Sequence, residues 1–502
     1  MAATANKRFQ PRAGLVSALV ALGLVSPACA LEWTIEPSIG ASATYTDNVR
    51  QSASNPENAL ILTATPAVSL RSKGSRRVQA ALQYGLSAVT RFGGDDDSDL
   101  NHNLNAIGKA ELVEDFLFIE GDARVSQELV SLLGSPADAG VNNSNRATVG
   151  SYSISPYIKK RLGSFADAEA RYRTSGAIFG DNAANDINSN TFSASLKSGS
   201  QFSTIFWGLN YFLRDATVQG GDDAQFEHYD ATLGYRVTRK LRVFGTLGYD
   251  NNDYVATPGA SISGRSWTVG TGWTPNQRTN VEASFGDSYF GRTYGFDFRY
   301  RTRYSTWTAN YQEGVSDISQ QLLNTQPLAF WQCDGGVFAG TSQIPPAGQT
   351  NCVSLGVAPV GSVPLGTANG IYVSNTLRGG AAWSKGRSSL GLNVFSTRRQ
   401  YQQLAGLPED EVRGMTASYA YRLQPLTNLN ASLGYTNTQS AAGLDSVGER
   451  DDDYYTLSLG LSHRFDPKLV GTLTVRHQQR ESNDPAADYS ENSLTATVNM
   501  RF

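Results

Sequence analysis

Side chains that could do acid–base or nucleophilic chemistry form no recognisable motif in this chain. It has four histidines in 502 residues, at positions His102, His228, His463 and His477. Serine and aspartate are plentiful, but no nucleophile elbow, HExxH or CxxC sequence brings them into the spacings that hydrolases, metalloproteases or thiol oxidoreductases use. The sequence therefore indicates a protein that is not an enzyme and that needs no catalytic metal or other cofactor.

The first 30 residues have the pattern of a secretory signal peptide. Basic residues precede an apolar run at 13–25, and the small-x-small sequence at 28–30 fits a cleavage site. The mature chain is then expected to start near Leu31. A lipoprotein is the alternative, with Cys29 as the acylated residue, although the preceding Ser-Pro suits that signal poorly.

Charge and cysteine content bound the function further. The formal net charge is −3, and it becomes −6 once the three basic residues of the signal peptide are removed. A mildly acidic exported chain is no candidate for binding nucleic acid. Two cysteines remain, Cys333 and Cys352, and export makes a disulfide between them the natural expectation.

Strict alternation of apolar and polar residues fills the chain from Trp33 to Phe502. The chain ends "SLTATVNMRF", in which every second residue back from Phe502 is apolar. This period of two predicts strands with one oily and one polar face. We count about 22 such segments, each long enough for the roughly 9–11 residues that a tilted strand needs to cross a bilayer.

The connections between these segments alternate in length. Short, often basic connections such as 159–164 alternate with longer, often acidic ones such as 180–190. Short turns at one end and long loops at the other are typical of outer-membrane barrels. A soluble propeller would show a fixed blade repeat, and a sandwich would not keep an oily face over more than 450 residues.

The sequence therefore predicts an all-β fold with one domain after the signal peptide. Residues 31–502 are expected to form a single antiparallel up-and-down transmembrane β-barrel with an even number of strands, about 22 within 18–24. The first strand begins so close to the cleavage site that no N-terminal plug domain is expected. The expected location is the outer membrane of a Gram-negative bacterium, with lipid and lipopolysaccharide as surroundings.

The last strand has a second expected role. It must close against the first, because an open edge in lipid leaves backbone groups unpaired. Phe502, Met500 and Val498 also resemble the C-terminal signal by which the outer-membrane assembly machinery recognises its barrels.

If the oily positions face lipid, the residues between them face the lumen. Eight charged residues are candidates for the lumen wall: Glu120, Asp122, Arg124, Arg171, Arg173, Arg299, Arg301 and Arg303. They either pair across neighbouring strands and keep the wall wet, or tune which solutes pass, with anionic chains favoured near the basic column at 299–303. The same parity places His228 inward and the other three histidines on the lipid-facing register.

A barrel of this strand number is too wide for side chains alone to fill. Any constriction is expected from the segment at about 319–372, which is rich in Pro, Gly and Ser and contains both mature cysteines. A loop this long is often functional. It is either a lid or lumen constriction closed by the disulfide, or a surface loop without such a role.

Two stretches resemble a known family. The opening "WTIEPSIGASATYTDNV" and the next strand pair, "ALILTATPAVSLRSKGSRRVQAALQYGL", resemble the outer-membrane β-barrel family associated with PEP-CTERM/exosortase systems. The resemblance is specific over about the first 70 mature residues. It implies a place in exopolysaccharide production and export, with the polymer and its export components as partners, and it carries over no site residues.

The expected function is thus a porin-like conduit for exopolysaccharide or another envelope polymer. One alternative is a general diffusion porin for small solutes. The other is an occluded structural or adhesive barrel, whose long loops contact extracellular material.

Overall fold

The structure is a computed structural model of the chain. It describes residues 32–73, 75–93, 97–131, 133–134, 145–180, 184–258, 260–317, 320, 328–333, 336–340, 353–358, 370–403, 409–441 and 449–502. The predicted signal peptide, residues 1–30 with Cys29, lies outside the described residues.

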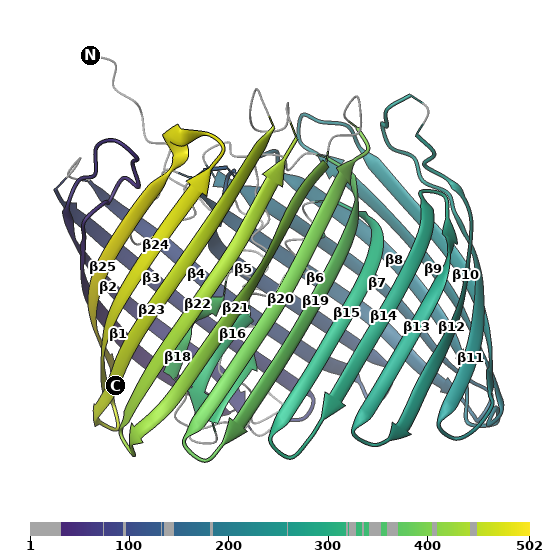
Figure 1. Cartoon of the computed structure of the whole chain (residues 1–502). Helices are drawn as coiled ribbons and strands as arrows, with labels where there is room; N and C mark the ends of the chain where they lie inside the picture. The colour runs from purple at the N-terminus through teal and green to yellow at the C-terminus, as the bar shows by residue number, and fades with distance from the viewer. Residues whose placement is uncertain are drawn as a thin grey trace.

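Twenty-two strands form one antiparallel sheet that closes on itself. Each strand pairs with its neighbours in the chain, and β25 pairs back with β1, from Ser38 opposite Arg501 to Thr46 opposite Ser493. The closed barrel is seen from the side in Figure 1. The predicted all-β antiparallel barrel and its strand number are confirmed, and the absence of an N-terminal plug stays a prediction.

The wall strands have the following bounds: β1 (Glu32–Thr46), β2 (Ala59–Lys73), β3 (Val78–Phe92), β4 (Ser98–Val113), β5 (Leu117–Leu129), β6 (Arg146–Leu162), β7 (Ala166–Phe179), β8 (Ile187–Ser198), β9 (Ile205–Val218), β10 (Ala224–Arg236), β11 (Leu241–Asp250), β12 (Gly264–Asn276), β13 (Thr279–Ser288), β14 (Gly291–Arg301), β15 (Ser305–Ser316), β19 (Tyr372–Lys385), β20 (Ser388–Tyr401), β21 (Glu409–Gln424), β22 (Thr427–Ser440), β23 (Arg450–Asp466), β24 (Leu469–Ser482) and β25 (Tyr489–Arg501). A turn of 3-10 helix, Pro485–Ala487, precedes β25.

The outer face of the wall is apolar because alternate residues of every strand point outward. Leu233 and Leu247, on β10 and β11, are 64% and 72% exposed. Such a surface is unfavourable in water but matches a hydrocarbon layer, in which the backbone groups of a closed sheet pair between neighbouring strands. No helix among the described residues has the length and apolar character to cross a membrane.

Closure also places the C-terminal residues. Val498 lies opposite Ala41 and Met500 opposite Ile39. Phe502 lies just past β25, donates its backbone N–H to the carbonyl of Pro37 at 3.0 Å, and has a side chain that is 60% exposed. The role of these residues as an assembly signal stays a prediction.

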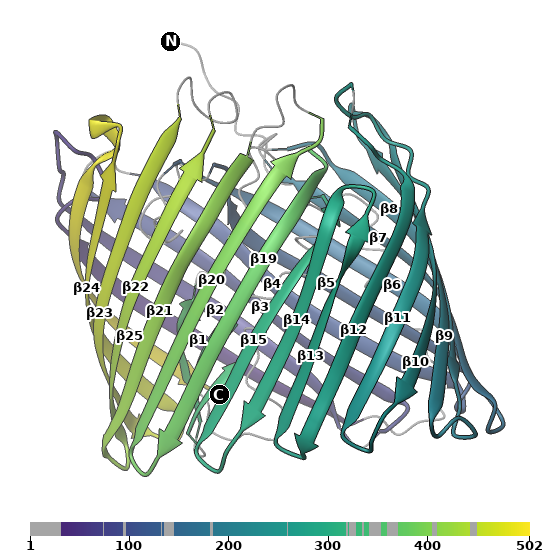
Figure 2. The same cartoon turned by 45° about the vertical axis from the view of Figure 1, so that its right-hand side comes forward.

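The connections alternate in length, as the sequence predicts. At one end they are as short as residues 386–387 and 467–468, whereas at the other they include 130–145 and 251–263. One connection at the long-loop end departs from this rule, because β13 and β14 are joined by Tyr289 and Phe290 alone. The β13–β14 hairpin consequently ends lower than neighbouring strands (Figure 2).

The segment at about 319–372, which the sequence predicts as a loop, contains regular structure. It contains a separate three-stranded antiparallel sheet of β16 (Leu328–Cys333), β17 (Gly336–Gly340) and β18 (Val353–Ala358), with β16 in the middle. Gln332 pairs with Val353 at the end of the β16–β18 ladder, and Cys333 pairs with Gly336 of β17. Cys352, and with it the predicted disulfide, lies outside the described residues. The described residues contain no globular domain apart from the barrel and this sheet.

Candidate functional site in the barrel lumen

Charges on the inner face of β4 to β7 form one bonded cluster. Glu120 accepts hydrogen bonds from Arg171 at 2.8 Å and from the Tyr157 hydroxyl at 2.9 Å. The ammonium of Lys109 lies 3.1 Å from the same carboxylate, and the Arg171 guanidinium lies 3.8 Å from the Tyr157 ring centre. In this sector the charges pair across neighbouring strands, which is the first of the two interpretations drawn from the sequence.

Other predicted lumen residues lie close to this cluster. Asp122 accepts a hydrogen bond from Ser153, and Arg124 lies 3.5 Å from Glu128 on its own strand. Arg173 is two residues from Arg171 on β7 and therefore on the same inward face. These predicted residues thus share one face of this part of the wall, and their role in the lumen stays a prediction.

The predicted basic column is shorter than expected. Arg299 and Arg301 lie on the inward face of β14 and are exposed, and neither has an ion pair with another described residue. The prediction that Arg303 belongs to this strand is wrong, because β14 ends at Arg301. Arg303 lies in the turn after β14, where the Thr302 hydroxyl accepts the backbone N–H groups of Tyr304 and Ser305 at 3.2 and 2.8 Å and so ends the strand.

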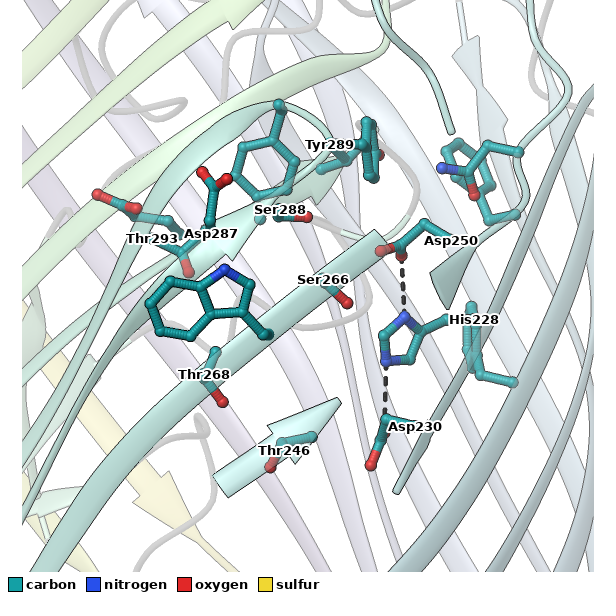
Figure 3. Close-up of a pocket in the computed structure, with 18 of the residues that line it drawn as sticks. His228, Asp230, Thr246, Asp250, Ser266, Thr268, Asp287, Ser288, Tyr289 and Thr293 are labelled. Atoms are coloured by element: carbon teal, nitrogen blue, oxygen red, sulfur yellow. Dashed lines mark hydrogen bonds and ion pairs between the residues drawn. The ribbon is translucent and has the colours of Figure 1, made fainter. Parts of the chain in front are cut away.

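The histidines take the faces that their parity predicts. Three lie on the outer register, each bonded to a neighbouring side chain: His102 with Tyr84, His463 with Thr427 and His477 with Asn492. His228 on β10 points inward (Figure 3). Its register partner on β11 is Asp250.

His228 lies between two carboxylates. Its Nδ1 is 2.9 Å from Asp250, and its Nε2 is 3.3 Å from Asp230, as the dashed lines of Figure 3 mark. Asn210 donates a further bond to Asp230 at 2.9 Å. A neutral imidazole donates from one nitrogen only, so this arrangement favours the doubly protonated ring. Both ring nitrogens of His228 are thus bonded to carboxylates, and neither is available to activate a serine. His228, Asp230 and Asp250 together form a fixed polar group on the wall.

A cavity of about 350 Å³ opens beside this histidine. It is lined by hydroxyl, carboxylate and aromatic side chains, and includes no Lys or Arg. Its lining residues are Phe212, Phe226, Glu227, His228, Asp230, Thr246, Asp250, Asn252, Ser266, Trp267, Thr268, Asp287, Ser288, Tyr289, Phe290, Thr293, Glu313, Gly314, Val315 and Gln320. Aromatic faces combined with a few convergent polar groups are typical of a ligand pocket.

The wall is split beside this cavity. β14 and β15 pair only from Phe296 opposite Tyr311 to Arg301 opposite Thr306. Toward the long-loop end, residues 291–295 pair with β13 alone, and residues 312–316 pair with β19 alone. The two strands therefore separate over five residues each. A sequence pattern cannot show this, because side-chain alternation continues whether or not two strands are hydrogen-bonded.

Contacts between loops narrow the mouth at the long-loop end. Arg480 of β24 donates to the carbonyl of Gly134, in the β5–β6 connection, at 3.0 Å. The amide of Thr257, in the β11–β12 connection, donates to the carbonyl of Gln402, after β20, at 2.8 Å. Both bonds join parts of the barrel that are not neighbours in the wall.

Aromatic rings lie flat on the inner wall at three places. In each case a phenylalanine pairs with a glycine of the next strand, and a Cβ added to that glycine would meet the ring: Phe206 with Gly234, Phe244 with Gly270, and Phe395 with Gly414. The guanidinium of Arg236 lies 5.1 Å from the centre of the Phe206 ring. Flat, partly exposed rings offer stacking surfaces to a passing solute.

Sequence reasoning identified the inward charges and His228 but missed its two carboxylates. The spacing of His228 and Asp230 on one face of a strand could have predicted the first contact. The contact with Asp250 could not be predicted without the β10–β11 register. Among the described residues, no group of three or more His, Cys, Asp or Glu side chains is arranged to hold a metal ion.

No protein-family model matches the chain, and no curated protein matches it. Among solved structures, it is similar to the FrpB iron transporter of Neisseria meningitidis (F3-3 variant), with 12% identity and a TM-score of 0.49 over 93% of this chain and 81% of that one. The siderophore receptor PirA of Acinetobacter baumannii gives 10% identity and a TM-score of 0.47 over 93% and 80%. A mutant ferric enterobactin receptor of Pseudomonas aeruginosa, PfeA, gives 10% and 0.49 over 93% and 81%.

The closed sheet, its apolar outer face and its polar, charged lumen define the class of this protein. It is a large outer-membrane-type β-barrel of 22 antiparallel strands.

Proposed function

We propose that this protein is an outer-membrane conduit for a hydrophilic polymer, namely an exopolysaccharide on its way out of the cell. The observation that carries the proposal is the width of the barrel combined with its polar inner face. Twenty-two strands enclose a lumen that side chains alone do not fill. Permeation through such a lumen needs no cofactor and no catalytic group.

The lining of the lumen supports a polysaccharide over small ions. Flat rings such as Phe206 and Phe244 lie on the inner wall close to glycines, and hydroxyl groups such as Thr246 and Ser266 surround the cavity. Sugars present apolar ring faces and many hydroxyl groups, so alternating rings and hydrogen-bonding groups suit them. The resemblance of the first mature strands to the PEP-CTERM-associated barrels points to the same class of cargo.

Single-channel conductance of the refolded mature protein in a planar bilayer tests this proposal. We expect steady conductance steps and brief blockades when an oligosaccharide, for example maltohexaose, is added. Conductance without saccharide blockades would favour a general diffusion porin. A folded barrel that gives no conductance would favour an occluded structural barrel and contradict the conduit. Repeating the recording with a reductant tests whether a Cys333–Cys352 disulfide controls the opening.

Arg299 and Arg301 give a sharper version of the test. Replacing Arg299 and Arg301 by Glu should shift the reversal potential in a salt gradient toward cation preference, because both side chains face the lumen without an ion pair to another described residue. The matched control carries Glu at Arg239 and Lys240, which lie in the β10–β11 turn. It changes the total charge equally, and it should shift the reversal potential much less.

A further inference from the structure

The split between β14 and β15 is a framed opening in the barrel wall. Its lower edge is the last ladder pair, Phe296 with Tyr311. One side is the β13–β14 hairpin and the other is the upper part of β15, which is held by β19. We call this opening the side window.

Loops close the frame above the side window. Tyr254 of the β11–β12 connection belongs to one buried apolar cluster with Phe226 of β10 and Ile371, the residue before β19. The Thr257–Gln402 bond joins the same two regions of the rim. These contacts pass above the four strands from β12 to β15. The β13–β14 hairpin ends lower, at Tyr289 and Phe290, so the opening lies in the side of the barrel below these loops.

Residues of this frame, among them Phe290, Thr293 and Gly314, line the cavity of about 350 Å³. Its lining includes lumen-facing residues such as Asp230 and Ser266, and residues of the outer register such as Trp267 and Asp287. Gly314 of β15 also lines it, and a Cβ added there would meet no atom within 4 Å. The lining therefore includes residues of both faces of the wall, and there is open space beside Gly314.

The height of the side window suits a polar molecule. Trp267 and Tyr294 are exposed on the outer face near its lower edge, and aromatic residues of this kind mark the membrane interface of a barrel. The outward residue opposite Trp267 is Asp287, whose own partner is Arg292, two residues from Tyr294 toward the hairpin tip. Both are polar and exposed. Glu313 accepts the Tyr294 N–H. The other backbone groups of the split thus lie at headgroup level, where water satisfies them, and not in hydrocarbon.

The lining indicates which polar molecule would fit. It combines aromatic rings with Ser and Thr hydroxyls, and it carries five carboxylates against one imidazole and no Lys or Arg. This charge balance disfavours an anionic chain. A neutral or basic saccharide offers hydroxyl groups to the carboxylates and ring faces to the aromatics.

We propose that the side window is a lateral exit with a saccharide-binding pocket, through which a neutral or basic glycan segment leaves the lumen at the outer membrane surface. This inference rests on the proposed conduit function and adds to it a route and a preference for the charge of the cargo.

Engineered cysteine pairs test whether the window exists, independently of any function. In a background with Ser at Cys333 and Cys352, Thr293→Cys with Gly314→Cys spans the window, and Asp297→Cys with Asn310→Cys joins the paired part of the same strands. A disulfide needs Cα atoms within about 7 Å. We expect rapid oxidation of the control pair and much slower oxidation of the window pair. Equal rates would mean that the ladder continues, and would overturn the proposal.

A tryptophan at Gly314 tests the exit itself. The free space around Gly314 lets Gly314→Trp fill the window in a folded barrel, which the heat-dependent gel shift of folded barrels verifies. The matched control is Gly208→Trp, an inward glycine of β9 whose added Cβ has its nearest neighbour at 3.9 Å. Maltohexaose added on the long-loop side of a planar bilayer is the probe, with a galacturonate hexamer as the anionic comparison.

The outcomes separate this inference from the conduit proposal. We expect wild type and Gly208→Trp to show blockades by maltohexaose and few by the galacturonate, and Gly314→Trp to lower the maltohexaose association constant by about 5-fold or more, as loss of a binding contact would. Unchanged blockades in Gly314→Trp, or stronger blockade by the galacturonate, would overturn the lateral exit alone. No conductance in the wild type would overturn the conduit instead.

Discussion

Glu313 of β15 bonds to the backbone of Tyr294 on β14 at the level where the two strands no longer pair. Its carboxylate accepts the Tyr294 N–H at 3.1 Å and also the hydroxyl of Tyr311. A side chain thus satisfies an amide that the neighbouring strand would otherwise pair. This contact is a latch between the two edges of the side window.

Removing this latch should destabilise the barrel only slightly. Glu313→Ala leaves the Tyr294 N–H and the Tyr311 hydroxyl without their acceptor, which should lower the free energy of unfolding by about 1 kcal/mol, the worth of a typical hydrogen bond. Glu313→Gln keeps an acceptor for the amide and should stay close to wild type. Urea titration of the refolded barrel measures the difference, and equal losses in both variants would contradict the latch.

The charged cluster around Glu120 should control ion selectivity in its sector. Arg171→Ala removes one cation and leaves Glu120 with Lys109 and Tyr157. We expect the cation-to-anion permeability ratio to rise by about 1.5- to 5-fold, the range that 0.2–1 kcal/mol for an exposed pair corresponds to. Reversal potentials in a salt gradient measure this ratio. Arg239→Ala, in a turn, is the matched control, and an equal effect of both variants would show that the cluster does not face the permeating ions.

Deleting Phe502 should separate assembly from stability. The residue lies past the β1–β25 ladder, which ends at the Ser38–Arg501 pair, and its side chain is largely exposed. Protein refolded in detergent should therefore keep its stability within about 0.5 kcal/mol, as expected for a surface change. In cells, the amount of folded barrel in the outer membrane should fall. If both quantities fall together, Phe502 has a structural role and is not an assembly signal.

Tyr289 should make the barrel sensitive to strong alkali. Burial raises the pKa of this phenol above its ordinary value of 10.0, and the nearby Tyr254 and Asp250 raise it further. Below pH 10 the phenol is neutral in both the folded and the unfolded chain, so its contribution to stability is complete there. At higher pH only the unfolded chain ionises, and stability is lost as the pH rises. Tyr289→Phe should lose less stability than wild type between pH 9 and 11, measured as the folded fraction in urea.

The sequence predicts the wall well because each residue of a membrane strand is in contact with either lipid or lumen. That constraint is local and has a period of two, so it places Glu120, Arg171 and His228 on the correct face without any knowledge of neighbours. Arg303 shows where the constraint ends. The alternation of polar and apolar residues continues from Arg301 to Arg303. The Thr302 hydroxyl, however, accepts two backbone N–H groups, and the chain turns there.

Features that depend on which strands are hydrogen-bonded are absent from that pattern. Asp250 meets His228 only through the β10–β11 register. The split between β14 and β15 leaves the alternation of both strands intact, and the sheet of β16 to β18 lies in a segment whose Pro and Gly content favours a loop. Tertiary pairing decides these features, and local preference does not.

The flat rings on the inner wall also constrain how this protein can change over evolutionary time. A side chain at Gly234 would occupy the place of the Phe206 ring, and the same holds for Gly270 with Phe244. The glycine cannot be exchanged alone, because a larger residue there requires a smaller one at the phenylalanine. In related barrels these positions should therefore vary as couples, and a lineage that loses the ring is free to lose the glycine with it.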